Sequence, residues 1–87
     1  MVKKVVTIKN KTGLHARPAS EFVKKASTYC SDIILRHKGK EINAKSIISV
    51  LTAGISMGTV VEICAEGPDE KESVEGLSEL IQSNFGE

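Results

Sequence analysis

The spacing of apolar residues in the first third of the chain predicts a strand followed by a helix. Residues 4–9 alternate β-branched and polar side chains, as a half-buried strand does. After a break at Gly13, apolar residues recur every three or four positions through residues 16–30, which predicts a helix with one buried face. Pro18 is compatible only with the first turn of this helix, because proline has no N–H to donate to a preceding turn. The helix should therefore begin close to residues 15–17.

The middle of the chain predicts a hairpin and a short helix. Two extended runs within residues 32–44 flank a Lys-Gly pair, where Gly39 can supply the positive φ that a tight turn needs. Ser46 then precedes a cluster of apolar residues, and Gly54 follows it. A serine before an apolar run and a glycine after it are helix start and stop signals, so we expect a helix of about two turns or fewer.

The last third of the chain predicts one more strand and a terminal helix. Residues 59–66 alternate again between apolar and polar side chains. Asp69, with Glu72 three residues later, resembles a capping box at the start of a helix. The apolar stripe behind it should end near Gly86, and it consists of Val74, Leu77, Leu80, Ile81 and Phe85.

The element order β-α-β-β-α-β-α predicts an α+β fold. Short connections and the hairpin favour one mostly antiparallel sheet with the two longer helices on a single face, which leaves the other face to solvent. The 87 residues suffice for one domain and are too few for two, and no repeat or linker divides them. We therefore expect a single domain over residues 1–87.

Composition argues against several classes of function. Twelve basic and eleven acidic residues leave a formal net charge of +1, and the aromatic residues are one Tyr and two Phe. Nucleic acid is therefore not expected as a direct partner, since such binding relies on positive charge and on base stacking. No apolar run approaches the roughly 20 residues of a membrane span, and the N-terminus does not resemble a secretory signal. We expect a cytoplasmic protein with no membrane insertion.

The two cysteines, Cys30 and Cys64, lie far apart and outside any CxxC pattern. Buried free thiols in a reducing cytosol are favoured, and a structural disulfide is the alternative. The spacing excludes a local zinc clip, and the chain has no nucleotide-binding loop. We therefore expect neither a metal nor a cofactor.

The stretch GLHARPAS, residues 13–20, places His15 at the expected start of the first helix. Taken alone, a histidine there is more often a surface residue or a cap. A helix N-terminus, however, offers unpaired backbone N–H groups and the positive end of the helix dipole, which together bind anions. Arg17 adds donors suited to phosphate oxygens. This arrangement predicts an imidazole that accepts a phosphoryl group and, with no second base or nucleotide loop nearby, passes it on.

Ser46 and the residues after it have a structural interpretation that needs no function. A serine N-cap stabilises a helix by about 1 kcal/mol, which alone would account for this residue. One face of a two-turn helix cannot bury every apolar side chain of this segment, so some should be exposed and available to partners. These side chains are Ile47, Ile48, Val50 and Leu51.

GLHARPAS at 13–20 and NAKSIISVLTAGISMG at 43–58 together resemble the HPr family, the histidine-containing phosphocarriers of the bacterial sugar phosphotransferase system. The resemblance runs the length of the chain. It implies an open-faced β-sandwich, a four-stranded antiparallel sheet with three helices on one side. It also implies that Nδ1 of His15 takes a phosphoryl group from phosphorylated Enzyme I and passes it to sugar-specific IIA proteins. The chain would then be a stoichiometric carrier and not an enzyme, with Arg17, Ala16 and Thr12 around the phosphate.

The resemblance also implies regulation and docking. Lys45-Ser46-Ile47 is similar to the site that HPr kinase/phosphorylase phosphorylates with ATP in Gram-positive members, whose phosphorylated form is a corepressor with the catabolite control protein. A monomer is expected for a carrier that docks many partners in turn. Many relatives have Met at position 48 and a basic residue at position 27, where this chain has Ile48 and Ser27. The implied docking residues are Ser20, Lys24, Ile47, Ile48 and Leu51.

Three alternatives remain open. The first is a regulatory member that acts only through Ser46, as the Crh branch does, although that branch lacks the active histidine and His15 is present here. The second is a small α+β hydrolase of acyl phosphates with Arg17 as its anion binder, but its motif is not found. The third is a general interaction domain, which composition alone would allow. Turnover of a small phosphorylated substrate would favour the hydrolase, and a label that persists on His15 would favour the carrier.

Overall fold

A computed structural model describes residues 1–86, and in this part of the chain the elements follow the predicted order. The strands are β1 (Val2–Thr7), β2 (Asp32–His37), β3 (Lys40–Asn43) and β4 (Val60–Glu66). The helices are α1 (Ala16–Ser27), α2 (Ile47–Thr52) and α3 (Glu70–Gln82), and a 3-10 turn, η1 (Asn84–Gly86), follows α3. Among residues 1–86, no helix combines the length and the apolar character needed to cross a membrane.

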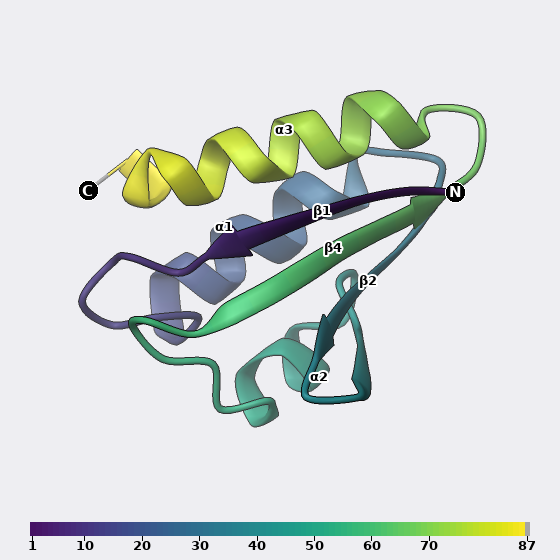
Figure 1. Ribbon diagram of the computed structural model, residues 1–87. Coiled ribbons are helices and arrows are strands. Elements are labelled where there is room, and N and C mark those ends of the chain that lie inside the picture. The colour runs from purple at the N-terminus through teal and green to yellow at the C-terminus, as the bar shows by residue number, and fades with distance from the viewer. Residues whose placement is uncertain (87) are drawn as a thin grey trace.

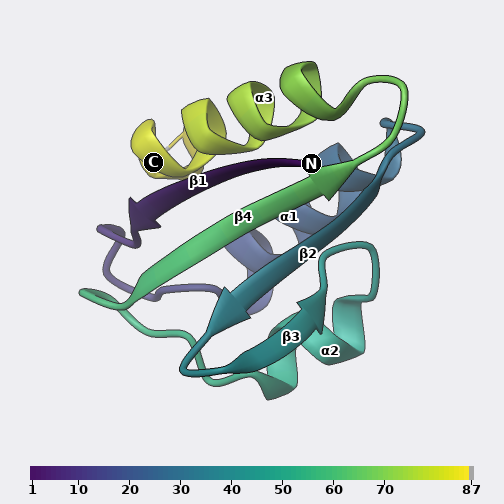
Figure 2. The same ribbon diagram turned by 45° about the vertical axis from the view of Figure 1, so that its right-hand side comes forward.

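The four strands form one antiparallel sheet in the order β1-β4-β2-β3. Val6 of β1 pairs with Val61 of β4, and Ile63, two residues further along β4, pairs with Leu35 of β2. Because side chains alternate along a strand, these four residues share one face of the sheet. All three helices cover that face and leave the other open (Figures 1 and 2). The open-faced β-sandwich is therefore confirmed.

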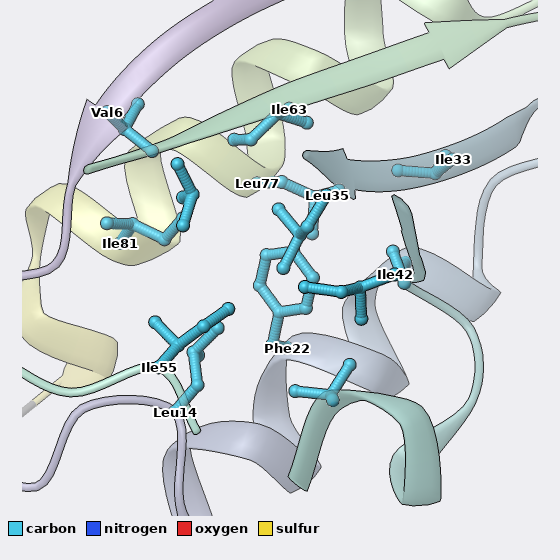
Figure 3. Packing of buried hydrophobic residues seen from close by; sticks show 14 of the residues in the cluster. Val6, Leu14, Phe22, Ile33, Leu35, Ile42, Ile55, Ile63, Leu77 and Ile81 are labelled. Carbon is cyan, nitrogen blue, oxygen red and sulfur yellow. The ribbon is translucent and has the colours of Figure 1, made fainter. Parts of the chain in front are cut away.

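The core lies between this face and the helices, and it is mainly aliphatic. Phe22 of α1 is fully buried, and its ring points toward Leu35 of the sheet (Figure 3). The predicted stripe of the last helix is also buried, except that Leu80 is only partly covered. Val50 is the fully buried residue of α2. The core therefore draws side chains from every helix and holds the N-terminus of α1 in a fixed relation to α2.

The predicted hairpin is confirmed. Lys38 and Gly39 join β2 to β3 with φ angles of 49° and 78°, and a two-residue turn of this kind needs positive φ at both positions. His37 pairs with Lys40 across the turn. His37 is half-buried and lines the hollow between β3 and α2.

The first strand is shifted toward the N-terminus relative to the predicted residues 4–9. Val2 already pairs with Ala65, and the terminal ammonium of Met1 lies 3.2 Å from the Glu70 carboxylate. Ile8 still donates a hydrogen bond to the Thr59 carbonyl at 2.9 Å, although it lies beyond the strand. The chain then leaves the sheet toward the loop that precedes α1.

The predicted capping box at the start of α3 is wrong. The Asp69 carboxylate makes no capping hydrogen bond to α3 and instead accepts hydrogen bonds from the Ser31 hydroxyl and from the backbone N–H groups of Cys30 and Ser31, the last two at 2.8 and 2.9 Å. These donors, the Ser31 hydroxyl first, hold the pKa of Asp69 below its usual value. Asp69 therefore joins α3 to the loop between α1 and β2. Its Ser31 partner lies 38 residues away, beyond the reach of a local motif.

The last helix ends earlier than predicted. Helix α3 stops at Gln82, and Asn84 and Phe85 then take left-handed φ angles of 55° and 57°. Phe85 still enters the core with 4% of its surface exposed. The apolar stripe was therefore identified correctly, but its last member belongs to the turn after the helix.

One of the two cysteine expectations is wrong. Both thiols are free, but Cys30 is exposed, because α1 ends at Ser27 and leaves Cys30 in the following loop. Cys64 is buried at the centre of the open face of the sheet, with its thiol 3.4 Å from the Glu62 carboxylate. Burial, with the hydrogen bond to Glu62 as a second cause, raises the pKa of the Cys64 thiol.

Candidate functional site

The loop before α1 is fixed by buried hydrogen bonds. The Asn10 side-chain amide donates to the Gly13 carbonyl at 2.9 Å, and the Gly13 N–H donates to the Asn10 carbonyl at 3.1 Å. The Leu14 N–H donates to the Ile55 carbonyl at 2.9 Å. Gly13 has a φ of 64°, and a Cβ there would lie 2.5 Å from the Ile55 carbonyl oxygen. The backbone before His15 is therefore held closely against the loop that follows α2.

His15 is exposed and occupies the N-cap position of α1, with extended φ and ψ angles of −133° and 151°. Within the described residues its side chain makes no capping hydrogen bond, so the imidazole is not engaged by the helix. Ala16, the next residue, has a φ of 49°, a conformation that costs a residue with a Cβ about 1–2 kcal/mol. Such strain is typical of functional sites. Pro18 lies in the first turn, as predicted.

The positive end of the α1 dipole is uncompensated within the helix. The first turn carries no acidic residue, while Lys24 and Lys25 lie in the last turn. Arg17 and Ala16 are exposed beside His15, and their backbone N–H groups belong to the first turn, which has no intrahelical acceptors for them. Together with the Arg17 guanidinium, these groups suit a tetrahedral anion at this end of α1.

Thr12, an expected member of the phosphate cradle, is exposed, and its hydroxyl accepts a hydrogen bond from the Asn10 amide at 3.3 Å. The structure thus joins Thr12 to the loop before α1. Asn10 itself was not identified from the sequence, since an asparagine in a loop carries no pattern of its own. Its 4% exposure and its hydrogen bonds to the glycine loop give it a structural role at the site.

Ser46 is the N-cap of α2, as predicted. Its hydroxyl accepts a hydrogen bond from the Ser49 N–H at 3.3 Å, and its carbonyl accepts one from Val50 at 3.0 Å. The ammonium of the preceding residue, Lys45, donates to the Tyr29 carbonyl at 2.8 Å, which ties the start of α2 to the segment just after α1. Ser46 as a whole residue is half-buried.

The expectation that α2 exposes part of its apolar surface is confirmed. Val50 is fully buried, whereas Ile48 is 69% exposed and Ile47 and Leu51 are more than a third exposed. Helices α1 and α2 pack against each other, and the exposed Ser20 and Lys24 belong to α1. We call the five expected docking residues, all exposed on these two helices, the α1–α2 surface; its members are Ser20, Lys24, Ile47, Ile48 and Leu51.

An open-faced β-sandwich with an exposed histidine at the start of its first helix is the architecture of the histidine phosphocarriers. The chain belongs to the HPr family: the family model described as "PTS HPr component phosphorylation site" matches residues 2–83. The phosphocarrier protein HPr of Borreliella burgdorferi is 48% identical over 83 residues, which cover 95% of this chain and 96% of that relative.

Further relatives lie on two branches of the family. The HPr-like protein Crh of Bacillus subtilis is 44% identical over 82 residues, covering 94% of this chain and 96% of Crh. A crystal structure of HPr from Thermoanaerobacter tengcongensis is 49% identical, covers 100% of this chain and 98% of its own, and superposes with a TM-score of 0.98. Another structure of that HPr is described as a dimer and superposes with a TM-score of 0.81.

Proposed function

We propose that this chain carries a phosphoryl group on His15, received from phosphorylated Enzyme I and passed to sugar-specific IIA proteins. One observation carries the proposal: an exposed imidazole stands at the N-terminus of α1, where the helix dipole is uncompensated. Membership of the HPr family supports the same conclusion. The chain acts as a stoichiometric carrier, because the group leaves in the form in which it arrived.

The chemistry is the transfer of a phosphoryl group to a ring nitrogen. As the bond from Nδ1 of His15 to phosphorus forms, the bond from phosphorus to Enzyme I breaks, and the electron pair of that bond stays with Enzyme I. Charge on the three phosphoryl oxygens is balanced by the Arg17 guanidinium and by the N–H groups of Ala16 and Arg17. Thr12 contributes to this cradle through the loop that it shares with Asn10.

A relay assay tests this function. The chain is incubated with Enzyme I and labelled phosphoenolpyruvate, freed of both, and then mixed with a IIA protein. We expect label on the chain, followed by its movement to IIA on mixing. A label released as inorganic phosphate before IIA is added would favour the hydrolase, and a chain that never takes label would contradict the carrier.

The α1–α2 surface is the proposed docking site for Enzyme I, for the IIA proteins, for HPr kinase/phosphorylase and for the catabolite control protein. Two of its members, Ser20 and Lys24, lie on the helix that His15 precedes, and its α2 members are exposed apolar side chains, which are typical of interface centres. A carrier that presents one surface to several partners in turn works as a monomer in the cytoplasm. Because two related structures are described as dimers, the oligomeric state of this chain should be measured by light scattering.

Phosphorylation of Ser46 by HPr kinase/phosphorylase is the proposed regulation. The site lies at the edge of the α1–α2 surface, so a phosphate there adds negative charge where partners dock. We expect Ser46→Asp to slow phosphorylation of His15 by Enzyme I, while Ser46→Ala, which adds no charge, keeps a rate near that of the wild type. Equal rates for Ser46→Asp and the wild type would contradict this regulation.

The second candidate is a regulatory member of the family that acts only through Ser46. The similarity to Crh supports this candidate. It predicts that His15 takes no phosphoryl group from an active Enzyme I, so the relay assay also decides between the two.

A further inference from the structure

Two exposed lysines, Lys9 and Lys11, lie on the loop between β1 and α1, on either side of the buried Asn10. The backbone around them is anchored, because the Ile8 N–H and the Asn10 side-chain amide each donate to a backbone carbonyl at 2.9 Å. Ile8 and Asn10 are buried, so the alternation along this stretch presents both lysines to solvent. The loop therefore holds two cationic side chains a few residues before His15.

The two lysines line one cavity of about 470 Å³ between this loop and the C-terminal turn. Figures 1 and 2 place the segment after β1 and the C-terminal end of α3 at the same end of the molecule. Within residues 1–86, neither lysine forms an ion pair. The other lining residues are uncharged, and none belongs to the α1–α2 surface; they are Asn10, Thr12 and Asn84.

The charges of the described chain are unevenly divided between the two ends of the sheet. Because Thr7 pairs with Val60 at the end of β1, the loops before α1 and before β4 lie at the same end. The described segments that meet there are residues 8–17, 38–39, 53–59 and 83–86. They contain no carboxylate, and their cations are Lys9, Lys11, Arg17 and Lys38. Carboxylates gather at the other end, at Asp32, Glu66, Asp69, Glu70 and Glu72. The end that carries His15 therefore attracts anions.

We propose that Lys9 and Lys11 form a second docking contact, separate from the α1–α2 surface, which receives acidic side chains of Enzyme I at this cavity. The inference rests on the proposed function, in which Enzyme I brings a negatively charged phosphoryl group to His15. Lysine ammonium groups on long, flexible stems suit the attraction of carboxylates on a partner's surface better than the tight enclosure of a small ion. Such charges at the rim of an interface act mainly on the association rate and on its dependence on salt.

Charge reversal tests the contact. Lys9→Glu/Lys11→Glu is compared with Lys3→Glu/Lys71→Glu, which changes the net charge equally at the other end of the sheet. All four lysines are exposed, so the thermal stability of both variants should stay close to that of the wild type. At an ionic strength of about 0.01 M, we expect Lys9→Glu/Lys11→Glu to lower kcat/KM for phosphorylation by Enzyme I about tenfold. At about 0.1 M, where the screening length falls from about 30 Å to about 10 Å, the loss should shrink to about threefold. The control variant should remain within about twofold of the wild type at both salt concentrations.

The contact is also located without phosphoryl transfer. Addition of unphosphorylated Enzyme I to the isotope-labelled chain should shift the NMR signals of the amides of residues 9–12, and Lys9→Glu/Lys11→Glu should lose these shifts. Equal kinetic losses in the two double variants, or NMR shifts confined to the α1–α2 surface, would overturn the second contact while a labelled wild type still supports the carrier. A wild type that takes no label would instead contradict the proposed function.

Discussion

At the scale of single residues, the site depends on backbone geometry as much as on the side chains that carry its chemistry. Gly13 lies so close to the Ile55–Ser56 backbone that a Cβ has no space, and the strained Ala16 follows His15 directly. Both features lie within two residues of His15 and fix the backbone that holds its imidazole away from the core. The histidine is exposed, but the backbone on either side of it is constrained.

Gly13→Ala tests this constraint, with Gly39→Ala as the matched control. Both glycines have positive φ, but a Cβ at Gly39 meets nothing within 4 Å. Left-handed strain should cost each variant about 1–2 kcal/mol of unfolding free energy. Overpacking should cost Gly13→Ala about 1–3 kcal/mol more. Urea unfolding measures both, and equal losses in the two variants would contradict the close approach.

The residues with proposed chemical roles could be identified from the sequence, and the residues that support them in the fold could not. His15, Arg17 and Ser46 were identified because each combines a reactive or charged side chain with a helix-start signal. Asn10 was not identified, because its importance arises from burial and from its hydrogen-bond partners in the folded loop. No local sequence pattern marks an amide that becomes buried on folding.

At the scale of elements, periodicity predicted which segments are helices and strands, and long-range contacts decided where they end. The hairpin and the Ser46 cap follow from local chemistry and are confirmed. The end of α3 depends on Phe85, which is buried in the turn after the helix. The environment of Asp69 depends on Ser31, which lies 38 residues away and reaches Asp69 only on folding. The α1–β2 loop is consequently tied to α3 by one carboxylate.

The hydrogen bonds from the α1–β2 loop to the Asp69 carboxylate predict that the stability of the fold depends on pH. The pKa of Asp69 is lower in the folded chain than in the unfolded chain. The ionised carboxylate therefore contributes fully to the free energy of unfolding above about pH 4, the pKa of an unfolded aspartate, and this contribution is lost as the pH falls through the folded-state pKa. Asp69→Asn should therefore be less stable than the wild type at neutral pH and should lose less stability on acidification. Asp32→Asn, which alters an exposed carboxylate at the start of β2, is the control. Thermal unfolding at pH 7 and pH 3 measures both, and parallel losses in Asp69→Asn and the wild type would refute the tie.

At the scale of the whole molecule, the proposed function uses only one of the two sides. His15 and the α1–α2 surface belong to helices that cover one face of the sheet, whereas the open face carries an ion-pair row in which Arg36 lies between Glu41 and Glu62. This row and the paired strands belong to the sheet itself. The proposal therefore assigns docking to one side of the molecule and structure to the other.

Two matched variants test that division. Ile48 is 69% exposed on α2, and Val60 is 54% exposed on the sheet. Neither Ile48→Asp nor Val60→Asp should alter stability by more than about 0.5 kcal/mol, because both sites are on the surface. Ile48→Asp should raise the KM for phosphorylation by Enzyme I about tenfold, the loss expected at an interface centre. Val60→Asp should leave it unchanged, and equal effects of the two variants would contradict a single docking side.

The most direct test of the carrier function is the site of the phosphoryl group itself. Wild type, His15→Ala and His37→Ala are each incubated with Enzyme I and labelled phosphoenolpyruvate, and the bound label is counted and tested for lability in acid. We predict one acid-labile phosphoryl group per chain on the wild type and on His37→Ala, and none on His15→Ala. Label that survives in His15→Ala, or a folded wild type that takes none from an active Enzyme I, would contradict phosphoryl carriage on His15.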